Sequence, residues 1–356
     1  MIPVLRGCGR VRGGTAFAPM KLVHLDDVDW LEWGSPRGTF RGRGQQLSLA
    51  LGAVPDAPLT RGGHPFDLER GQLEPGKSGC PFHAHAAQWE LFVITGGEGA
   101  VRHGARRTTV RAGDAIIHPP GPEAHQLINT GSEVLEYWLV ADNPAVDVCH
   151  YPDSGKWSYR PDGGVFRKIP LDYYLDEEEG APAEAAPSPA PQPTSEQCAR
   201  VVSIAALPET TRLSPGGRFG SMRRDISLAL GGIADTGLWG GGHPFDLQQR
   251  RVPAGRAVCP RHAHTVQWEL FIALEGEADV RSGDETHRVR AGHVFLQPPG
   301  TAHQIRNAGE GDFSFYVIAD NPRADSCFYP ESKKWMLDPQ GVVFRMSETD
   351  YYDGEE

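Results

Sequence analysis

The sequence predicts an all-β protein made of two tandem jelly-roll barrels (double-stranded β-helices) joined by an acidic linker rich in alanine and proline. Three observations lead to this fold class. An internal repeat covers nearly the whole chain twice. Each copy consists of short apolar runs separated by Gly, Pro, Asn and Asp, and no segment has a long amphipathic helical pattern. Many short strands with frequent turns are typical of an antiparallel barrel.

The repeat is recognised by the heptapeptide GGHPFDL, which occupies residues 62–68 and again residues 241–247. The offset of 179 holds from SLALG to PPG and becomes 178 just before His125 and His303, where the first copy has one extra residue. The match continues through ADNP and ends at DYY. Each copy runs for about 150 residues, an ordinary domain size.

The repeat divides the chain into four parts. We expect a disordered leader at residues 1–20, an N-terminal barrel domain at 21–175, a flexible linker at 176–198 and a C-terminal barrel domain at 199–356. The linker contains EEEGAPAEAAPSPAPQPTSEQ, a composition that cannot build a core. The leader is rich in arginine and has no continuous apolar segment, so it does not read as a secretory signal.

Charge and composition restrict the partners. The net charge of −11 argues against nucleic acid or an anionic membrane, because neither would offset its own charge by binding here. No apolar run approaches the length that spans a bilayer, and the six cysteines have no dense spacing, which favours free thiols. We therefore expect a cytoplasmic protein with a small-molecule substrate, as a monomer or small homo-oligomer.

Several strands can be placed within the copies. Apolar runs at residues 91–95, 115–118 and 134–140 predict strands in the first copy. In the second copy, residues 275–292 predict a hairpin with a tight turn around residues 282–284.

Each copy repeats one set of potential metal ligands. The two sets are His83, His85, Glu90 and His125, and His262, His264, Glu269 and His303. Two histidines that are two residues apart on a strand face the same side. Glu90 has the opposite parity, so it joins them only if the chain bends between Ala86 and Trp89. Three imidazoles and one carboxylate suit a divalent transition metal, one per barrel, and leave Fe, Mn, Ni, Cu and Zn open.

These residues resemble the two sequence motifs of the cupin superfamily, roughly G-x5-H-x-H-x3-4-E-x6-G and G-x5-P-x-G-x2-H-x3-N. In the second copy, Gly292, Pro298, Gly300, His303 and Asn307 match the second motif; in the first copy, Gly113, Pro119, Gly121 and Asn129 match it. The leading glycine of the first motif is displaced by one residue in both copies. The resemblance implies a two-domain cupin (bicupin) with one metal per barrel and with Asn129 and Asn307 stabilising turns.

Residues beside the ligands carry further expectations. Gln88 and Gln267 share the parity of the glutamates, so they are candidates for catalysis, through a hydrogen bond to a ligand or to substrate, or else ordinary polar lining. Trp89 and Trp268 should face the other way and pack in the core or between the barrels.

We expect structural roles for several other residues that occur in both copies. We expect Cys80, Cys259, Cys149 and Cys327 to be buried thiols rather than ligands, and His64 and His243 to be satisfied by loop backbone.

The copies also differ. His118 of the first becomes Gln297, and Phe82 becomes Arg261. His118 is an acid/base candidate only if the fold brings it inside. Arg261 should lie on the outer face.

Three classes of function remain open. An open centre of three histidines and a glutamate can hold both O2 and a chelating substrate, and its spacing is similar to that of quercetinase-like dioxygenases. The leading hypothesis is therefore a dioxygenase-like oxidoreductase acting on a small organic substrate. The alternatives are a metal-dependent isomerase, epimerase or decarboxylase, and a non-catalytic binding protein.

Overall fold

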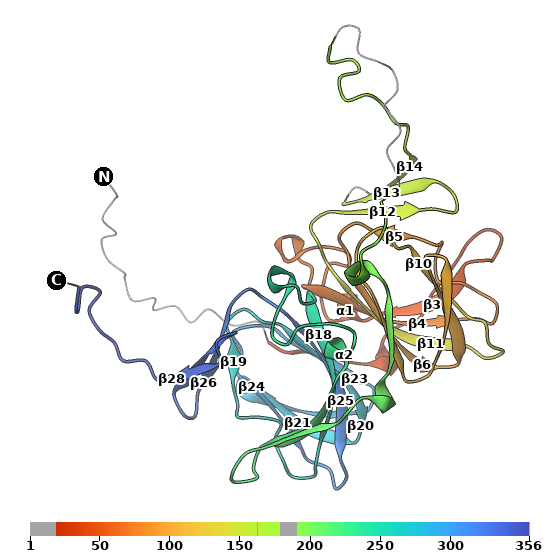
Figure 1. Ribbon diagram of the computed structural model, residues 1–356. Coiled ribbons are helices and arrows are strands. Elements are labelled where there is room, and N and C mark those ends of the chain that lie inside the picture. The colour runs from red at the N-terminus through yellow and green to blue at the C-terminus, as the bar shows by residue number, and fades with distance from the viewer. Residues whose placement is uncertain (1–18, 162, 179–190, 356) are drawn as a thin grey trace.

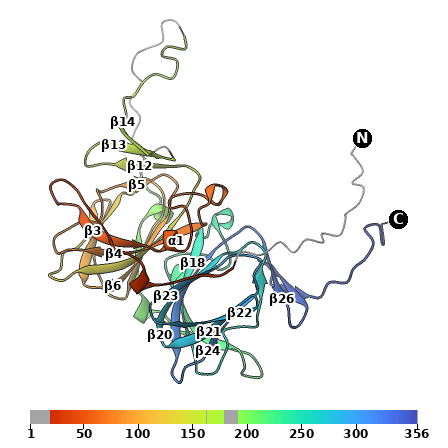
Figure 2. The same cartoon turned by 180° about the vertical axis from the view of Figure 1, so that it is seen from behind.

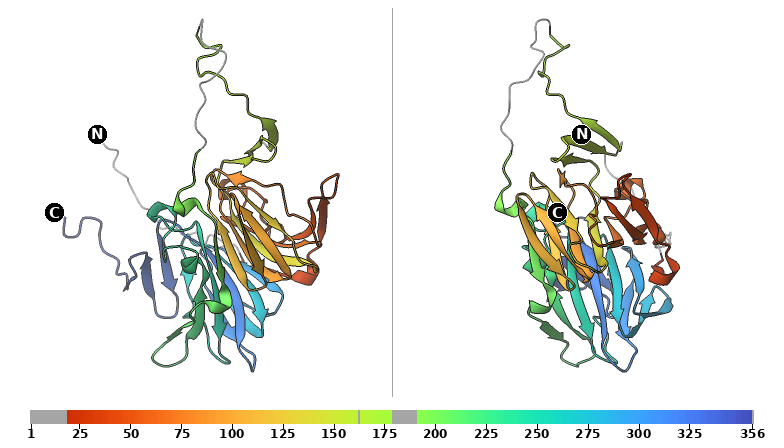
Figure 3. Two further views of the ribbon diagram at one scale, coloured as in Figure 1. Left: turned by 45° about the vertical axis from the view of Figure 1, so that its right-hand side comes forward. Right: turned by 90° about the vertical axis from the view of Figure 1, so that its right-hand side faces the viewer.

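The computed structural model describes residues 19–161, 163–178 and 191–355. Two β-barrels lie side by side, and a small ribbon of strands projects from an end of each (Figures 1 and 3). The α-helices and 3-10 turns among the described residues are only three or four residues long. None of the described helices is long and apolar enough to cross a bilayer.

The first barrel consists of three sheets. Its wall is a seven-stranded sheet with β15 (Arg200–Ser203), β9 (Asp114–His118), β6 (Glu90–Gly96), β11 (Leu135–Asp142), β4 (Phe66–Leu73), β3 (Arg41–Gln46) and β2 (Leu31–Gly34), in that order. The opposite wall has β10 (His125–Ile128), β7 (Glu98–His103) and β8 (Arg106–Arg111). The projecting ribbon has β14 (Gly164–Arg167), β13 (Lys156–Arg160), β12 (Asp147–Tyr151) and β5 (Ala84–His85).

The second barrel repeats this plan. Its seven-stranded sheet has β1 (Lys21–His24), β23 (His293–Gln297), β20 (Glu269–Glu275), β25 (Phe313–Asp320), β18 (Phe245–Val252), β17 (Gly220–Asp225) and β16 (Thr210–Leu213). The opposite wall has β22 (Glu285–Arg290), β21 (Glu277–Ser282) and β24 (His303–Asn307). The ribbon has β19 (Ala263–His264), β26 (Asp325–Tyr329), β27 (Lys334–Asp338) and β28 (Val342–Phe344).

Short helical turns occupy matching places in the two copies. They are η1 (Leu25–Asp27), α1 (Leu47–Ala50) and η2 (Leu59–Arg61) in the first, and η4 (Ile204–Ala206), α2 (Ile226–Ala229) and η5 (Leu238–Gly240) in the second, with η3 (Ser195–Gln197) between them.

The barrels exchange their first strands. Strand β1 precedes the first copy in the sequence but pairs with β23 of the second barrel (Figure 2). Strand β15 precedes the second copy and pairs with β9 of the first barrel. Each seven-stranded sheet is thus completed by a strand that continues into the other barrel. A division of the chain at residues 175 and 199 would separate both strands from the sheets they complete.

Three large apolar clusters and a small one of Phe82, Ala84 and Ala124 make up the core. One fills the first barrel around Phe92 and Val101, and another fills the second around Phe271 and Phe295. The largest lies between the barrels and draws side chains from both, with Phe66 and Phe245 in ring contact at 5.9 Å. Buried apolar area of this extent makes the pair of barrels one packed body.

Two histidines pack reciprocally against tryptophans at the inter-barrel contact, with their rings tilted by 37° and 43°. His64 of the first barrel lies 5.4 Å from the ring of Trp268, and His243 of the second lies 5.0 Å from the ring of Trp89. The tryptophans therefore pack between the barrels, as the sequence predicted. Neither ring nitrogen of His243 has a hydrogen-bond partner, nor has Nδ1 of His64. The expectation that loop backbone satisfies these nitrogens is wrong, because the rings lie against indoles instead.

The strands predicted from the sequence are confirmed. The three predicted runs lie in β6, β9 and β11, and the predicted hairpin is formed by β21 and β22 around Gly283, which has a φ of +57°. Asn129 stabilises its turn as expected: its Nδ2 donates to the carbonyls of Leu73 and Glu133, both at 2.8 Å. Asn307 does the same in the second barrel.

The expected leader and linker lie largely outside the described residues, which omit 1–18 and 179–190. The last residues of the expected linker are described. Thr194 and Gln197 form a capping box around η3, and the N–H of Ala199 donates to Glu123 Oε2 at 2.6 Å. This stretch leads directly into the exchanged strand β15.

The two buried histidines at the inter-barrel contact, His64 and His243, predict that this contact is sensitive to acid. Burial lowers the pKa of both His64 and His243 to about 4, whereas an unfolded histidine titrates near 6.5. The unfolded chain therefore binds more protons as the pH falls from 6.5 to 4, and stability is lost over that window, on the order of 2 kcal/mol for each histidine. Urea unfolding of the His64→Phe/His243→Phe protein should show a shallower loss of stability than wild type over this range. His287→Phe, on β22 and outside the contact, should keep the wild-type slope; equal slopes in all three proteins would contradict the assignment.

Candidate metal centres

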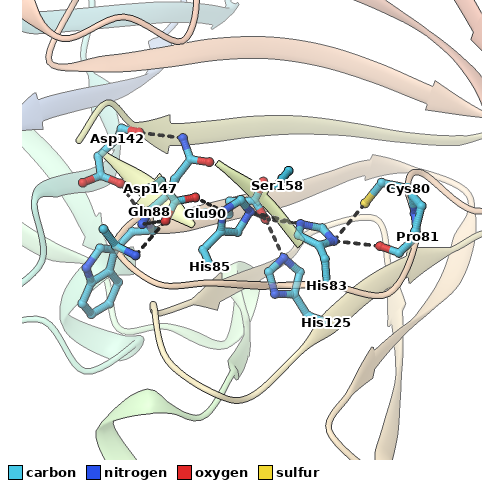
Figure 4. A network of polar contacts seen from close by, with 12 residues as sticks. Cys80, Pro81, His83, His85, Gln88, Glu90, His125, Asp142, Asp147 and Ser158 are labelled. Atoms are coloured by element: carbon cyan, nitrogen blue, oxygen red, sulfur yellow. Dashed lines mark hydrogen bonds and ion pairs between the residues drawn. The ribbon is translucent and has the colours of Figure 1, made fainter. Parts of the chain in front are cut away.

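Four predicted ligands of the first copy converge inside its barrel. His83, His85, Glu90 and His125 are all buried, and each offers one ligating atom within 4.8 Å of the others (Figure 4). Nε2 of His125 lies 2.5 Å from Oε2 of Glu90, and the Nε2 atoms of His83 and His85 are 3.1 Å apart. The structure therefore brings together every ligand expected for this barrel.

This donor set fits a divalent transition metal. Such an ion lies about 2 Å from each imidazole nitrogen or carboxylate oxygen, which leaves the ligand atoms roughly 3 Å apart. Nδ1 of His83 donates to the carbonyl of Pro81 at 2.8 Å, and Nδ1 of His85 donates to Oδ2 of Asp147 at 2.6 Å. Because these outer nitrogens carry the protons, both Nε2 lone pairs point into the cluster.

The bend predicted between the histidines and Glu90 is present. Strand β5 ends at His85 and β6 begins at Glu90. Two carboxylates hold the intervening turn: Oδ1 of Asp147 accepts from the N–H of Ala87 at 2.8 Å, and Oδ1 of Asp142 accepts from the N–H of Trp89 at 2.7 Å. The bend changes the parity, so Glu90 faces the same interior as the histidines.

Asp147 is the functional residue that sequence reasoning missed. It orients the His85 ring and also holds the bend, and the hydrogen bond and charge of His85 outweigh burial to lower its pKa to about 2. Asp325 repeats the arrangement, with Oδ2 at 2.6 Å from Nδ1 of His264. The signal was visible as ADNP-x-x-D, which occurs in both copies. A carboxylate behind a ligating histidine sets its tautomer and raises its basicity.

The electrostatics of the first cluster favour a cation. Burial alone would raise the pKa of Glu90, but the hydrogen bond from His125 and the charges of the histidines hold it well below the ordinary value. Burial and the neighbouring His83 lower the pKa of His125 to about 4. Glu90 is therefore a carboxylate and His125 a neutral imidazole at neutral pH, the protonation states in which these groups bind metals. The pKa of His83 is raised instead, through Cys80 and the charge of Glu90, which outweigh burial.

The second cluster is looser. His262, Glu269 and His303 group within 4.8 Å, whereas His264 groups with His262 and Cys327. Nε2 of His264 is still only 3.6 Å from Oε2 of Glu269, so all four expected residues surround one point. His262, His264 and Glu269 keep part of their surface exposed, unlike their first-barrel counterparts.

Cys327 lies closer to the ligands than its reading as an inert thiol implied. It is 1% exposed, and its sulfur is within 4.8 Å of the ligating atoms of His262 and His264. Burial raises the pKa of this thiol, so it is neutral without a metal. Cys149 is buried at the matching place in the first barrel, where burial raises the thiol pKa to about 11.

The other sequence candidates occupy varied positions. Gln88 is buried beside the first cluster, but its Nε2 donates to the carbonyl of Asp142 and its Oε1 accepts from Arg160 rather than from a ligand. Gln267 likewise donates to the carbonyl of Asp320. Cys80 and Cys259 are only partly buried, and the Cys80 sulfur lies 3.4 Å from Nδ1 of His83, outside the cluster.

Of the residues that differ between the copies, His118 lies inside the first barrel. It stacks on His125 with ring centroids 4.0 Å apart, and burial holds its pKa well below the ordinary value. Its counterpart Gln297 accepts a hydrogen bond from Ser282 at 3.0 Å. Arg261 does not lie on the outer face as expected: its side chain is 14% exposed, it lines a cavity that also includes His264, and it donates to the carbonyl of Gly283.

A cavity of about 420 Å³ opens onto the first cluster. Its wall includes the four ligands together with Gln88, Glu69 and Arg160. Oε2 of Glu69 accepts from Gln46 at 2.7 Å, and burial raises the pKa of this carboxyl despite that hydrogen bond. Arg160 donates to Asp56 at 2.8 Å and to Gln88 at 3.0 Å. In the second copy of the repeat, Gln248 corresponds to Glu69 and Asp338 corresponds to Arg160.

Comparison with known proteins agrees with the duplicated barrel. A family model described as a cupin domain matches residues 60–141 and 249–319. An oxalate-binding protein of Thermotoga maritima is 34% identical over 71 residues, which are 20% of this chain and 57% of that relative. The chain thus spans little more than half the length of that relative.

Solved structures of two-barrel proteins resemble the whole chain. An oxalate decarboxylase of Bacillus subtilis has a TM-score of 0.52 at 15% identity, over 86% of this chain and 78% of its own. A putative glyoxylate-induced protein of Pseudomonas aeruginosa has a TM-score of 0.52 at 14% identity, over 85% and 88%. At these identities the likeness shows the fold.

Asp147 and Asp325 hydrogen-bond to His85 and His264, so removing either carboxylate should weaken metal binding in its own barrel only. Asp147→Asn should weaken metal binding in the first barrel by roughly 10- to 100-fold, because the amide cannot hold the imidazole as a carboxylate does. Asp325→Asn should do the same in the second barrel. Each variant, challenged with a chelator and then analysed for metal, should retain about one equivalent fewer per chain than wild type. Unchanged chelator competition in both variants would refute the assignment.

Proposed function

Because the chain is a two-domain member of the cupin superfamily, we propose that it is a metal-dependent enzyme acting on a small organic acid, with catalysis in the first barrel. The observation that carries the proposal is the first-barrel cavity, which places a partly buried carboxyl, Glu69, in one space with the His83, His85, Glu90 and His125 cluster. The second barrel has an amide, Gln248, at that position, so it lacks this proton-holding group.

A small carboxylate suits this cavity. Its volume of about 420 Å³ is at the small end of the range for ligand sites. Arg160 lies on its wall, and a guanidinium is well suited to binding a carboxylate through two N–H groups. Gln88 holds Arg160 on one side, while its other partner, Asp56, is largely exposed and can be displaced by a substrate. The oxalate-binding name of the sequence relative supports the same class.

Decarboxylation is the reaction best supported by these groups. A divalent metal at the cluster would supply Lewis acidity to the oxygens of the substrate. Arg160 would hold the carboxylate, and Glu69 would hold a proton close to the reacting carbon. When the bond between the carboxylate and its neighbouring carbon breaks, CO2 leaves and the electron pair stays on that carbon. The Glu69 proton then passes to the carbon, which balances the reaction without an external oxidant.

A dioxygenase-like oxidation is the second candidate. It is favoured by the donor set itself, because three imidazoles and one carboxylate leave coordination positions for O2 beside a chelating substrate. The two candidates differ in whether O2 is consumed in proportion to the substrate.

The role of Glu69 is tested by removing its proton. With oxalate as the substrate, Glu69→Gln should lower kcat by roughly 100-fold or more, because a general acid raises the reaction rate by about 10²–10⁴-fold. The metal content should not change. Glu98→Gln, an exposed carboxyl on β7 of the same barrel, is the matched control and should keep the wild-type rate. Formate and CO2 release are measured together with O2 uptake.

Comparison of the barrels completes the test. His83→Ala should abolish turnover, whereas His262→Ala should retain it. Full activity in Glu69→Gln, or activity that follows the second barrel, would disprove the assignment. Stoichiometric O2 consumption would favour the dioxygenase-like candidate.

A further inference from the structure

One pair of facing residues differs sharply between the two barrel interiors. In the first barrel Gly71 on β4 pairs with Tyr137 on β11, and a Cβ at Gly71 would lie 2.2 Å from Cζ of that ring. In the second barrel Arg250 on β18 pairs with Phe315 on β25. A long cationic side chain therefore occupies a position where the first barrel has no side chain at all.

Arg250 faces the interior of the second barrel. Alternate residues of a strand face the same side, and Val252, two residues along, is fully buried in the interior apolar cluster. Burial lowers the pKa of the Arg250 guanidinium, while the carboxylates of Glu269 and Asp225 oppose that shift. Arg250 thus lies within electrostatic reach of Glu269, the carboxylate of the second metal cluster.

The guanidinium has a hydrogen-bond partner but no counter-ion in contact. Its Nε and Nη2 both donate to Oε1 of Gln248, at 2.9 and 2.8 Å. Among the described residues no carboxylate oxygen lies within 4.0 Å of it. A glutamate at position 248, as the first barrel has at position 69, would neutralise this charge. Glutamine satisfies the N–H groups and leaves the charge in place.

A desolvated cation without a counter-ion in contact is costly, and a metal in the same barrel would add to the positive charge. Relative to the first barrel, the second exchanges Gly71 for Arg250, while its carboxyl moves from the position of Glu69 to that of Gln46, where it has Asp225 paired with Gln248. The second barrel thus gains one positive charge at these positions. Arg250 also keeps part of its surface accessible, as do His262, His264 and Glu269. The guanidinium and the cluster are thus each partly open to solvent.

We infer that the second barrel contains an oxyanion site in which Arg250 and a metal at the His262 cluster together bind one small carboxylate. The inference rests on the metal site proposed for this barrel and not on catalysis in the first. Since Gln248 replaces the proton-holding Glu69, the carboxylate is bound there without being decarboxylated. The two barrels thus have different tasks: turnover in the first and retention of an anion in the second.

The site differs from the arginine of the first cavity. Arg160 belongs to the projecting ribbon on β13 and is paired with Asp56. The repeat places Asp338 at the matching position of the second barrel. Each barrel therefore offers one arginine to its cluster, from the ribbon in the first case and from the barrel wall in the second.

The test uses full-length, metal-loaded His83→Ala protein, in which the first cluster is disabled. Calorimetric titration with oxalate should give about one binding event per chain. Adding Arg250→Met, which keeps the length but removes the charge, should weaken this event by roughly 10- to 100-fold, as expected for a charge-assisted contact. Arg250→Lys should fall between the two. Arg251→Met is the matched control, because Arg251 is partly exposed and paired with Glu209 and Asp312; it should bind as the parent does.

Two further measurements separate the possible failures. Metal content should remain one equivalent in every variant. The metal-free Arg250→Met protein should unfold at a temperature no lower than that of its parent, because the substitution removes an unneutralised cation. The double variant Arg250→Gly/Phe315→Tyr, which copies the first barrel, should also lose the binding event. Unchanged oxalate affinity in Arg250→Met, or no binding although the second barrel retains its metal, would overturn the inference. Oxalate turnover by wild-type protein is scored separately, so either proposal can fail alone.

Discussion

The convergence of three imidazoles on one buried carboxylate is the constraint on which the rest of the molecule depends. Burying a carboxylate costs free energy unless a cation or a complete set of hydrogen bonds compensates its charge. In the first barrel Glu90 reaches the histidines only because the chain bends after His85. Asp147 holds that bend and orients His85 at the same time. The ribbon strand that carries Asp147 is therefore part of the metal centre as much as the barrel wall is.

The duplication preserves this constraint while its surroundings diverge. Both barrels retain the four ligand types and the supporting aspartate, yet the side chains that face the clusters differ in charge. The first barrel surrounds its cluster with buried ligands and a protonatable Glu69. The second has Gln248 and Arg250 on its wall and a more exposed cluster. A carboxyl replaced by an amide and a glycine replaced by an arginine thus change the groups that surround two similar sets of potential ligands.

The sequence predicted what depends on local periodicity. The repeat, the strands and the ligand sets follow from residue spacing, and the bend before Glu90 follows from parity alone. Features that depend on long-range pairing were not predicted. Strand β1 is only four residues long, and nothing in KLVH says that it pairs with the second barrel. The packing of His64 against Trp268, and the proximity of Cys327 to His262, likewise require the folded positions of distant segments.

The exchange of first strands has a consequence for how the molecule is made. A chain that emerges from the ribosome N-terminus first presents β1 long before β23, its pairing partner, has been synthesised. The first barrel must also wait for β15, which lies beyond its own repeat. Pairings so distant in sequence are slow to form, and an unpaired strand edge invites association with other chains. The first barrel therefore cannot close its sheet until Arg200–Ser203 has been synthesised, and β1 has no partner strand until His293–Gln297 follows.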